Sequence, residues 1–156
     1  MTFSIHGTNR PRSHAVADPA QREEEIWLTV TDRFSLRRFL AFAETGRITY
    51  PDPLLALLRH KLAVARNACN PAPATLATFG RQVRYRLDNR SLLSEGLLAV
   101  GLVKLAGEVP IHSMLGATLL GMSVGQSTSF TGEKGITRKV TLVEVAGSQG
   151  RRPTGA

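Results

Sequence analysis

Residues 109–130, VPIHSMLGATLLGMSVGQSTSF, form the stretch that decides the fold. Within it, Leu115, Leu119 and Met122 follow one another at helical spacing, and glycines stand on both sides of them. Glycine permits tight turns and lets a backbone approach its neighbour closely. The pattern therefore predicts a short helix packed on a small sheet, followed by a strand over residues 125–130.

An alternating pattern precedes this stretch. Val83, Tyr85 and Leu87 alternate with arginines, which predicts a strand that is buried on one face. Residues 97–105, LLAVGLVKL, are apolar almost throughout and predict a second, more buried strand. Both strands are expected to belong to the sheet on which the short helix packs.

A last strand is expected over residues 136–145, which follow residues 125–130 across the tetrapeptide GEKG. Glycine at both ends of that tetrapeptide favours a hairpin turn. Val140 and Leu142 mark one face of the last strand. Residues 73–146 therefore predict a small antiparallel β domain with one short helix.

The chain ahead of this domain has a helical period. Thr31 or Asp32 is the expected N-cap of a first helix, and Gly46 is its expected end. Its apolar positions recur at i, i+3, i+4 and i+7, which places them on one face. They are Leu36, Phe39, Leu40 and Ala43.

A second helix is expected after the connector RITYPDP. Asp52 is its expected N-cap, Pro53 its first residue, and it should end before Pro71. That arm has about 17 residues and a length of about 25 Å. Two apolar faces joined by a short connector predict an antiparallel hairpin over residues 26–72. The apolar positions of the second helix are Leu55, Leu58, Leu62 and Ala65.

Both ends of the chain differ in composition from the rest. Residues 1–25 contain few apolar side chains, two prolines and no period, so they predict a disordered leader. Residues 147–156, GSQGRRPTGA, predict a flexible tail for the same reasons. The predicted chain is therefore of the α+β class: leader, helical hairpin over 26–72, β domain over 73–146 and tail.

The 156 residues carry 20 Lys and Arg against 12 Asp and Glu, a net charge of +8. The largest excess, +4, lies in residues 26–70. This charge predicts an anionic partner, which could be nucleic acid, an acidic membrane or an acidic protein surface. The longest apolar run, residues 97–103, is too short to span a bilayer. The single cysteine cannot form an internal disulfide, which fits a cytoplasmic protein.

No arrangement of residues predicts an enzyme, a metal site or a cofactor. His60 lies on an exposed stretch of helix, and His112 precedes Ser113 without an acidic third member at a recognisable spacing. No histidine and cysteine cluster has the spacing of metal ligands. Cys69, near the end of a helix, is expected to be a small buried apolar residue. GEKG lacks the upstream glycine and the Ser or Thr of a phosphate loop.

A small basic nucleic-acid-binding protein is an alternative reading of the charge. The connector between the helices has seven residues, which is longer than the turn of a helix-turn-helix. The β domain also offers few aromatic rings on which single-stranded bases could stack. The basic side chains of the first helix and its end are Arg33, Arg37, Arg38 and Arg47.

The segment around the short helix resembles the C-terminal domain of the GreA/GreB transcription elongation factors. That family has an element of the form sPlG.ALLG..vGd ahead of its last two strands. FGRQVRYRLDN, at residues 79–89, is similar to the family's first strand, and KVTLVEV, at 139–145, to its closing strand. The short hairpin is more similar to the regulator of nucleoside diphosphate kinase, Rnk. The residues that match the element are Ser113, Leu115, Gly116, Ala117, Leu119, Leu120, Gly121, Val124 and Gly125.

The resemblance implies an FKBP-like fold for the β domain and a module that binds RNA polymerase near its secondary channel. It implies a non-enzymatic, monomeric transcription regulator, with at most weak contact to nucleic acid. A prolyl isomerase, which can share this fold, would need an aromatic-lined pocket for which the domain has few rings. The residues expected to bind polymerase are Ser113, Met114, Leu115, Gly116, Leu119, Leu120 and Gly121.

The resemblance also draws attention to the hairpin tip, where Glu44, Arg47, Tyr50 and Asp52 lie. Cleavage-stimulating Gre factors carry paired acids at this tip, which help to hold a catalytic magnesium ion. Here Asp52 is expected to cap a helix and Glu44 to be a surface residue in the last turn of the first helix. The short hairpin and the separated acids therefore predict no metal binding and no stimulation of transcript cleavage.

Overall fold

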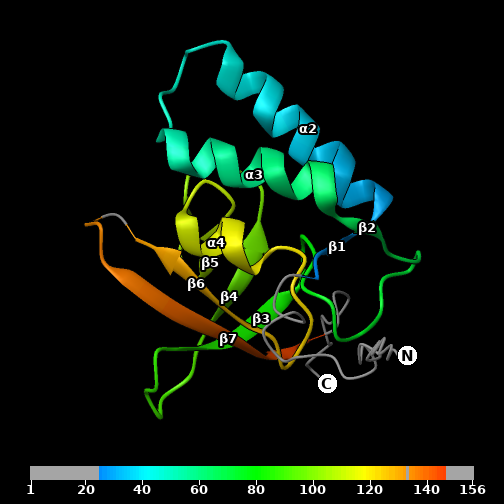
Figure 1. Ribbon diagram of the computed structural model, residues 1–156. Coiled ribbons are helices and arrows are strands. Elements are labelled where there is room, and N and C mark those ends of the chain that lie inside the picture. The colour runs from blue at the N-terminus through cyan, green and yellow to red at the C-terminus, as the bar shows by residue number, and fades with distance from the viewer. Residues whose placement is uncertain (1–24, 133, 147–156) are drawn as a thin grey trace, which may run out of the picture.

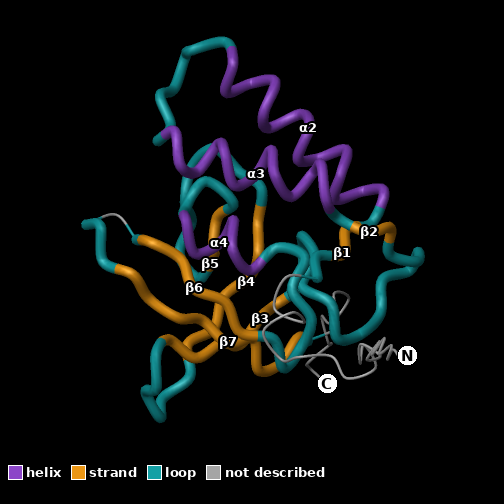
Figure 2. Tube along the Cα trace, in the orientation of Figure 1, coloured by secondary structure: helices purple, strands orange, loops and turns teal. Residues whose placement is uncertain are grey.

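The computed structural model describes residues 25–132 and 134–146. The predicted leader, except Glu25, and the predicted tail lie outside the described residues. Three helices lie together at one end of the molecule and a curled sheet lies at the other (Figures 1 and 2). The elements are β1 (Trp27–Leu28), α2 (Val30–Glu44), α3 (Asp52–Val64), β2 (Arg66–Asn67), β3 (Gln82–Leu87), β4 (Ser94–Ala99), β5 (Glu108–Pro110), α4 (Met114–Leu119), β6 (Ser127–Thr131) and β7 (Thr137–Val145).

Helix α2 begins earlier than predicted, because Thr29 and not Thr31 or Asp32 is its N-cap. The Thr29 hydroxyl accepts a hydrogen bond from the Asp32 amide at 2.9 Å. The Asp32 carboxylate in turn accepts one from the Thr29 amide at 3.2 Å. This reciprocal capping box satisfies two amides that have no partner within the helix. The helix ends as predicted, with Gly46 just beyond it in the left-handed region at φ 77°.

The apolar face of α2 is the predicted one, since Leu36, Phe39 and Leu40 are buried. Ala43 is half-buried against the same core. The spacing of the apolar residues in the sequence was enough to predict this buried face, because residues three and four apart lie on the same side of a helix.

Helix α3 departs from the prediction at both ends. Pro51 occupies the N-cap position, and Asp52 is already helical and makes no capping hydrogen bond. The helix ends at Val64, so it has 13 residues and a length of about 20 Å. It ends there because the chain turns into β2, which pairs in parallel with β1.

The buried face of α3 is also rotated from the predicted one. Leu54, Leu58 and Lys61 are buried, whereas the predicted Leu55 and Leu62 are only partly buried at its border. Both rows include Leu58 and run along neighbouring sides of the helix. The prediction chose the positions that are all apolar. It missed the buried face because that face includes the charged residue Lys61.

The sheet has the strand order β5-β4-β3-β7-β6. Neighbouring strands are antiparallel except for β4 and β5, which are parallel. The sheet is therefore mixed, and the prediction of a wholly antiparallel domain is wrong at this edge. The predicted alternation in β3 is confirmed, because Val83 and Tyr85 are buried and Arg84 between them is exposed.

The second predicted strand, residues 97–105, is displaced in the structure. Strand β4 covers Ser94–Ala99, and residues 100–107 form the crossover that a parallel neighbour requires. The side chains of Leu102, Val103 and Leu105 are 47%, 69% and 59% exposed on this crossover. Only the first part of the apolar run therefore enters the sheet.

The last two strands are confirmed as an antiparallel pair, β6 and β7. Between them the Gly132 amide donates to the Ile136 carbonyl at 2.9 Å, as expected for a turn at GEKG. Val140 and Leu142 are both fully buried, so they face the core as predicted.

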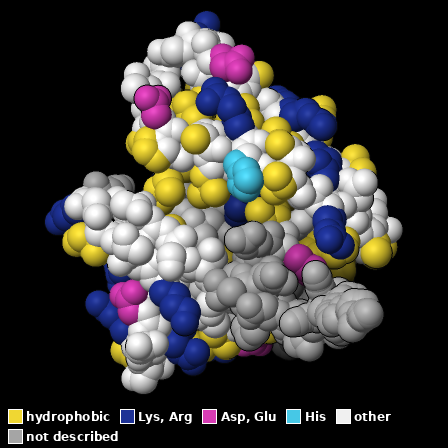
Figure 3. Space-filling view, viewed as in Figure 1, with side chains coloured by type: hydrophobic (Ala, Val, Ile, Leu, Met, Phe, Trp, Pro, Cys, Tyr) yellow, Lys and Arg dark blue, Asp and Glu magenta, His cyan; other side chains and the backbone are white. Residues whose placement is uncertain are grey.

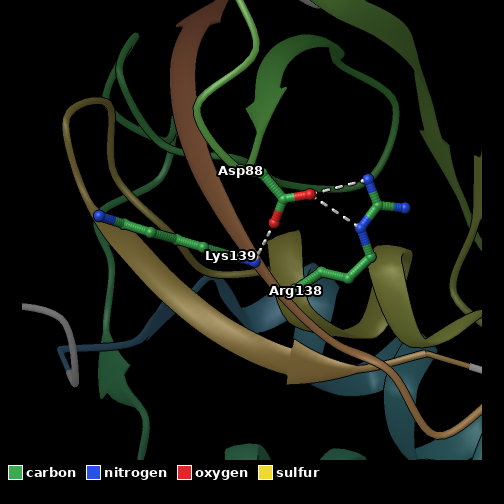
Figure 4. Close-up of polar contacts among 3 residues, drawn as sticks. All are labelled: Asp88, Arg138 and Lys139. Carbon is green, nitrogen blue, oxygen red and sulfur yellow. Dashed lines mark hydrogen bonds and ion pairs between the residues drawn. The ribbon is translucent and has the colours of Figure 1, made fainter.

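The turn that follows β3 begins at Asp88, whose side chain fixes it to the start of β7 (Figure 4). One carboxylate oxygen of Asp88 accepts hydrogen bonds from Arg138 Nε at 3.1 Å and Nη2 at 3.0 Å, and the other accepts one from the Lys139 amide at 3.1 Å. The bond from the Lys139 amide, followed by that from Arg138, lowers the pKa of Asp88. These bonds hold the end of β3 to its neighbour, with Asp88 in the left-handed region at φ 56°.

One hydrophobic core runs from the hairpin into the sheet. Helix α4 lies between α3 and the sheet, so it contributes side chains to both (Figure 1). The large apolar side chains with no exposed surface come from both the hairpin and the β domain: Leu28, Leu36, Leu58, Val83, Leu98, Ile111, Leu119, Leu120, Val140 and Leu142. The hairpin and the β domain therefore share their core.

Candidate protein-docking site

The segment that leads into α4 is held by its own polar groups. The Ser113 hydroxyl donates to the Pro110 carbonyl at 2.8 Å and accepts from the Gly116 amide at 3.0 Å. Ser113 is thus the N-cap of α4, a role for which serine is well suited. Because these bonds join the end of β5 to the first turn of α4, the segment has a fixed shape.

Two glycines of the segment are required by close packing. A Cβ atom at Gly116 would lie 2.0 Å from the Pro110 carbonyl oxygen. Gly121 has φ +88°, and a Cβ atom there would lie 2.7 Å from the Ile26 side chain. Both glycines therefore serve the fold directly.

The seven residues predicted to bind polymerase divide into two groups. Gly116, Leu119, Leu120 and Gly121 are buried, so their side chains and Cα atoms belong to the interior. Ser113, Met114 and Leu115 are partly exposed and lie together at the start of α4. We call these three residues the α4 entry. Only the α4 entry can touch a partner without a rearrangement of the core.

The hairpin tip divides in a similar way. Glu44, Arg47 and Asp52 are exposed, but Tyr50 is only 9% exposed. The Tyr50 ring lies with its centroid 5.0 Å from that of Phe39. The Tyr50 side chain, which was expected at the tip, is therefore part of the core, because burial of a large aromatic ring is favourable and its contact with a second ring adds to that gain.

Tyr50 also links the tip to the approach of α4. Its ring centroid lies 6.2 Å from that of His112, the residue before the α4 entry. The Tyr50 hydroxyl and His112 Nε2 are both buried, and neither has a hydrogen-bond partner among the described residues. Burial raises the pKa of Tyr50, so the phenol stays protonated over a wide range of pH.

Lys61 is the feature of this region that the sequence did not reveal. Lys61 is only 4% exposed. Its ammonium nitrogen donates hydrogen bonds to the carbonyl oxygens of Thr118 at 2.7 Å and Leu120 at 2.5 Å. These carbonyls lie at the C-terminal end of α4, where partial negative charge gathers. Burial lowers the pKa of Lys61 to about 7. The one signal in the sequence for the burial of Lys61 was its position seven residues after Leu54, which places both side chains on the same face of α3.

Two further side chains fix the base of the hairpin. The Asp32 carboxylate accepts a hydrogen bond from the Phe79 amide at 3.2 Å, which joins α2 to the chain ahead of β3. The Arg33 guanidinium donates to the carbonyls of Leu62 at 3.4 Å and Ala65 at 2.8 Å, at the end of α3. The Asp32 and Lys61 contacts therefore set the direction in which the hairpin points, and the Arg33 contacts join its two arms.

The predicted basic side chains are spread over the hairpin. Figure 3 shows Lys and Arg side chains distributed along the helices, with hydrophobic side chains between them. Arg37, Arg38 and Arg47 are exposed, and the Arg38 guanidinium lies 5.7 Å from the centroid of the exposed Phe34 ring. Within the described residues no group of three or more His, Cys, Asp or Glu side chains could hold a metal ion. No described helix is long and apolar enough to cross a membrane.

The fold resembles that of the Gre-type transcription elongation factors. A prokaryotic transcription elongation factor GreA/GreB from Nitrosomonas europaea matches with a TM-score of 0.59 and 22% identity, over 79% of this chain and 100% of that one. The Gfh1 protein of Thermus thermophilus, a GreA factor homolog, matches with 16% identity and a TM-score of 0.37, over 80% of this chain and 100% of that one. No protein-family model and no curated protein match the sequence. The first of these likenesses confirms the expected Gre-like fold.

Proposed function

We propose that this chain is a transcription regulator that binds RNA polymerase near the secondary channel through its Gre-like C-terminal part. The observation that carries the proposal is the fold shared with the Nitrosomonas europaea elongation factor, together with a partly exposed α4 entry. The regulator is non-enzymatic, monomeric and cytoplasmic. Its β domain is of the FKBP-like type, and its short hairpin places it nearest to the Rnk type.

The α4 entry suits a docking role because it is both accessible and fixed. Ser113 caps the helix, and the Met114 and Leu115 side chains pack partly against the core while keeping an exposed surface. A preorganised apolar surface binds with little loss of conformational entropy. The contacts of Lys61 and Asp32 then hold the hairpin in one direction relative to this surface.

A pull-down of core RNA polymerase with the full chain tests the proposal. The variant Leu115→Glu places a charge on the α4 entry and is expected to lower binding at least about tenfold, as the loss of a central apolar contact does. Leu92→Glu is the matched control, because Leu92 is 80% exposed in the β3–β4 connection. Both variants must keep the melting temperature of the parent chain. Equal binding by Leu115→Glu and the parent would refute docking through this surface.

The tip supports docking without stimulation of transcript cleavage. Glu44 and Asp52 are the exposed acids of the tip, and they belong to different helices with Arg47 between them in the chain. Helix α3 reaches only about 20 Å. Backtracked polymerase complexes incubated with this protein should therefore release short 3′ transcripts no faster than polymerase alone. Faster release that is lost in the Glu44→Ala, Asp52→Ala double variant would show that the tip argument is wrong.

Nucleic-acid binding is a second candidate, favoured by the exposed arginines of the hairpin. Arg37, Arg38, Arg47 and Arg59 are all exposed, and Phe34 offers a ring beside Arg38. Binding through such side chains should weaken steeply as salt rises, because each phosphate contact releases counterions. Polymerase binding that persists at a salt concentration that abolishes DNA and RNA binding would separate the two candidates.

A further inference from the structure

A cavity lies at the base of the hairpin, lined by residues other than those of the α4 entry. It has a volume of about 290 Å³ and opens beside β1 and β2. Its walls come from three segments that are far apart in the sequence: β1, the chain from 67 to 76, and Ser123. The lining residues are Trp27, Asn67, Ala68, Cys69, Pro73, Thr75, Leu76 and Ser123.

Hydrogen bonds fix the walls of this cavity. The Arg81 guanidinium donates to the carbonyls of Ala72, Pro73 and Leu76, which holds the outer wall as one piece. The Val124 amide donates to the Thr75 carbonyl at 2.9 Å, so the wall is also tied to the chain that follows α4. The opposite wall is held by the Ala68 amide, which donates to the Leu28 carbonyl at 3.0 Å. The cavity is therefore formed before anything binds.

The cavity is apolar inside, and one basic side chain, Arg66, lies next to its Trp27 wall without being one of the lining residues. The Trp27 ring and the Pro73 and Leu76 side chains supply apolar surface. The Arg66 guanidinium lies 5.7 Å from the centroid of the Trp27 ring. Arg66 is exposed, and none of the acidic side chains in the described part of the chain pairs with it.

We propose that this cavity binds a small aromatic carboxylate, with its ring against Trp27 and its carboxylate at the Arg66 guanidinium. The volume is at the lower end of the range for ligand sites, which suits one ring better than an extended molecule. An arginine fork matches a carboxylate in geometry and charge. The polar side chains of Asn67 and Ser123 have no hydrogen-bond partner among the described residues and can complete the shell around the carboxylate.

Two residues make the cavity easy to observe. Trp27 is the one tryptophan of the sequence and Cys69 the one cysteine, and both line this space. Cys69 is exposed, so the expectation that it is a buried apolar residue is wrong. It is exposed because the chain has already left α3 and runs along the surface there. Tryptophan emission and thiol reactivity each report on this one site.

The test is a titration of the full chain with phenylacetate, followed by Trp27 fluorescence and by the rate at which Cys69 reacts with Ellman's reagent. A saturable change in emission and slower reaction of Cys69 at the same concentrations are expected. The uncharged analogue 2-phenylethanol should bind about fivefold more weakly, the size of one exposed ion pair. Arg66→Gln should abolish that difference, whereas the control Arg59→Gln, on the exposed side of α3, should preserve it.

Ala68→Phe fills the cavity from its wall and should abolish binding of both compounds while the melting temperature of the chain is retained. Equal affinity for the acid and the alcohol in the parent chain would overturn the assignment of Arg66. An unsaturable response, or a Cys69 thiol that is already unreactive in the free chain because another part of the molecule fills the cavity, would overturn the site. None of these outcomes depends on whether the protein binds polymerase.

Discussion

The side-chain nitrogen of Lys61 lies 2.5 Å from the carbonyl oxygen of Leu120, so the second helix of the hairpin is joined to the end of α4. The contact links residues 59 positions apart in the sequence. It crosses the boundary that the sequence predicted between the hairpin and the β domain. The direction of the hairpin is therefore tied to the element that carries the proposed docking surface.

Stability should rise with pH because of Lys61. Its pKa is lowered to about 7 in the folded protein, from an ordinary value of 10.5. Between these values the unfolded chain binds the proton and the folded chain does not, so raising the pH favours folding. We expect the free energy of unfolding to rise by about 1 kcal/mol per pH unit between about pH 7 and pH 9.

Urea unfolding of the parent chain and of Lys61→Met at several pH values measures this effect. The slope should disappear in Lys61→Met and persist in Arg59→Met, which removes an exposed charge from the same helix. The range stays below pH 10 because Tyr50 and Tyr85, whose pKa values burial raises, lower stability at higher pH. A parent chain with no pH dependence in this window would contradict the assignment.

Gly116→Ala should destabilise the protein. The new Cβ atom would lie 2.0 Å from the Pro110 carbonyl oxygen, which belongs to the backbone and cannot move aside cheaply. We expect a loss of about 2 kcal/mol or more in thermal or urea unfolding. Gly101→Ala is the control, because its new atom would make only ordinary contacts, the nearest at 3.5 Å. Equal stability of the two variants would show that the approach of α4 to Pro110 is looser than described.

Thr29→Ala should cost about 1 kcal/mol of stability, since it removes the capping hydroxyl of α2. Thr31→Ala removes an exposed hydroxyl two residues further on and should change stability by less than about 0.5 kcal/mol. Far-ultraviolet circular dichroism during urea unfolding measures both. A larger loss of stability in Thr31→Ala than in Thr29→Ala would indicate that Thr31 is the N-cap, as the sequence alone had suggested.

Tyr50 should respond differently to two substitutions. Tyr50→Phe keeps the ring on Phe39 and removes a hydroxyl without a partner among the described residues, so stability should be unchanged or higher. Tyr50→Ala removes the ring and should cost about 3 kcal/mol. Differential scanning calorimetry of both variants checks the pair. Destabilisation by Tyr50→Phe of more than about 1 kcal/mol would indicate that the hydroxyl makes a bond, for instance through a water to His112.

Local patterns predicted much of the fold. The period of Leu36, Phe39 and Leu40 gave the buried face of α2, and the alternation at Val83 and Tyr85 gave β3. Helical spacing between glycines gave α4, and the two last strands were found with their turn. These features depend on residues close together in the chain, for which side-chain direction follows from the backbone repeat.

The misplaced elements have a common cause. Residues 97–105 look like one strand, but their second half crosses over to a parallel neighbour, which depends on a partner strand elsewhere in the chain. Helix α3 is cut short because β2 pairs with β1, nearly forty residues earlier. A single sequence gives each segment's preference and leaves the choice between partners open.

The candidate sites show the same division. The sequence by itself predicted a short, glycine-bounded helix within residues 113–121 and a basic hairpin. Only the tertiary structure decided that Leu119 and Leu120 are interior, that Tyr50 packs inward and that Lys61 is buried. It also brought Trp27, Cys69 and Ser123 around one cavity. Burial depends on what packs against a residue, and those neighbours come from distant segments that only the folded chain brings together.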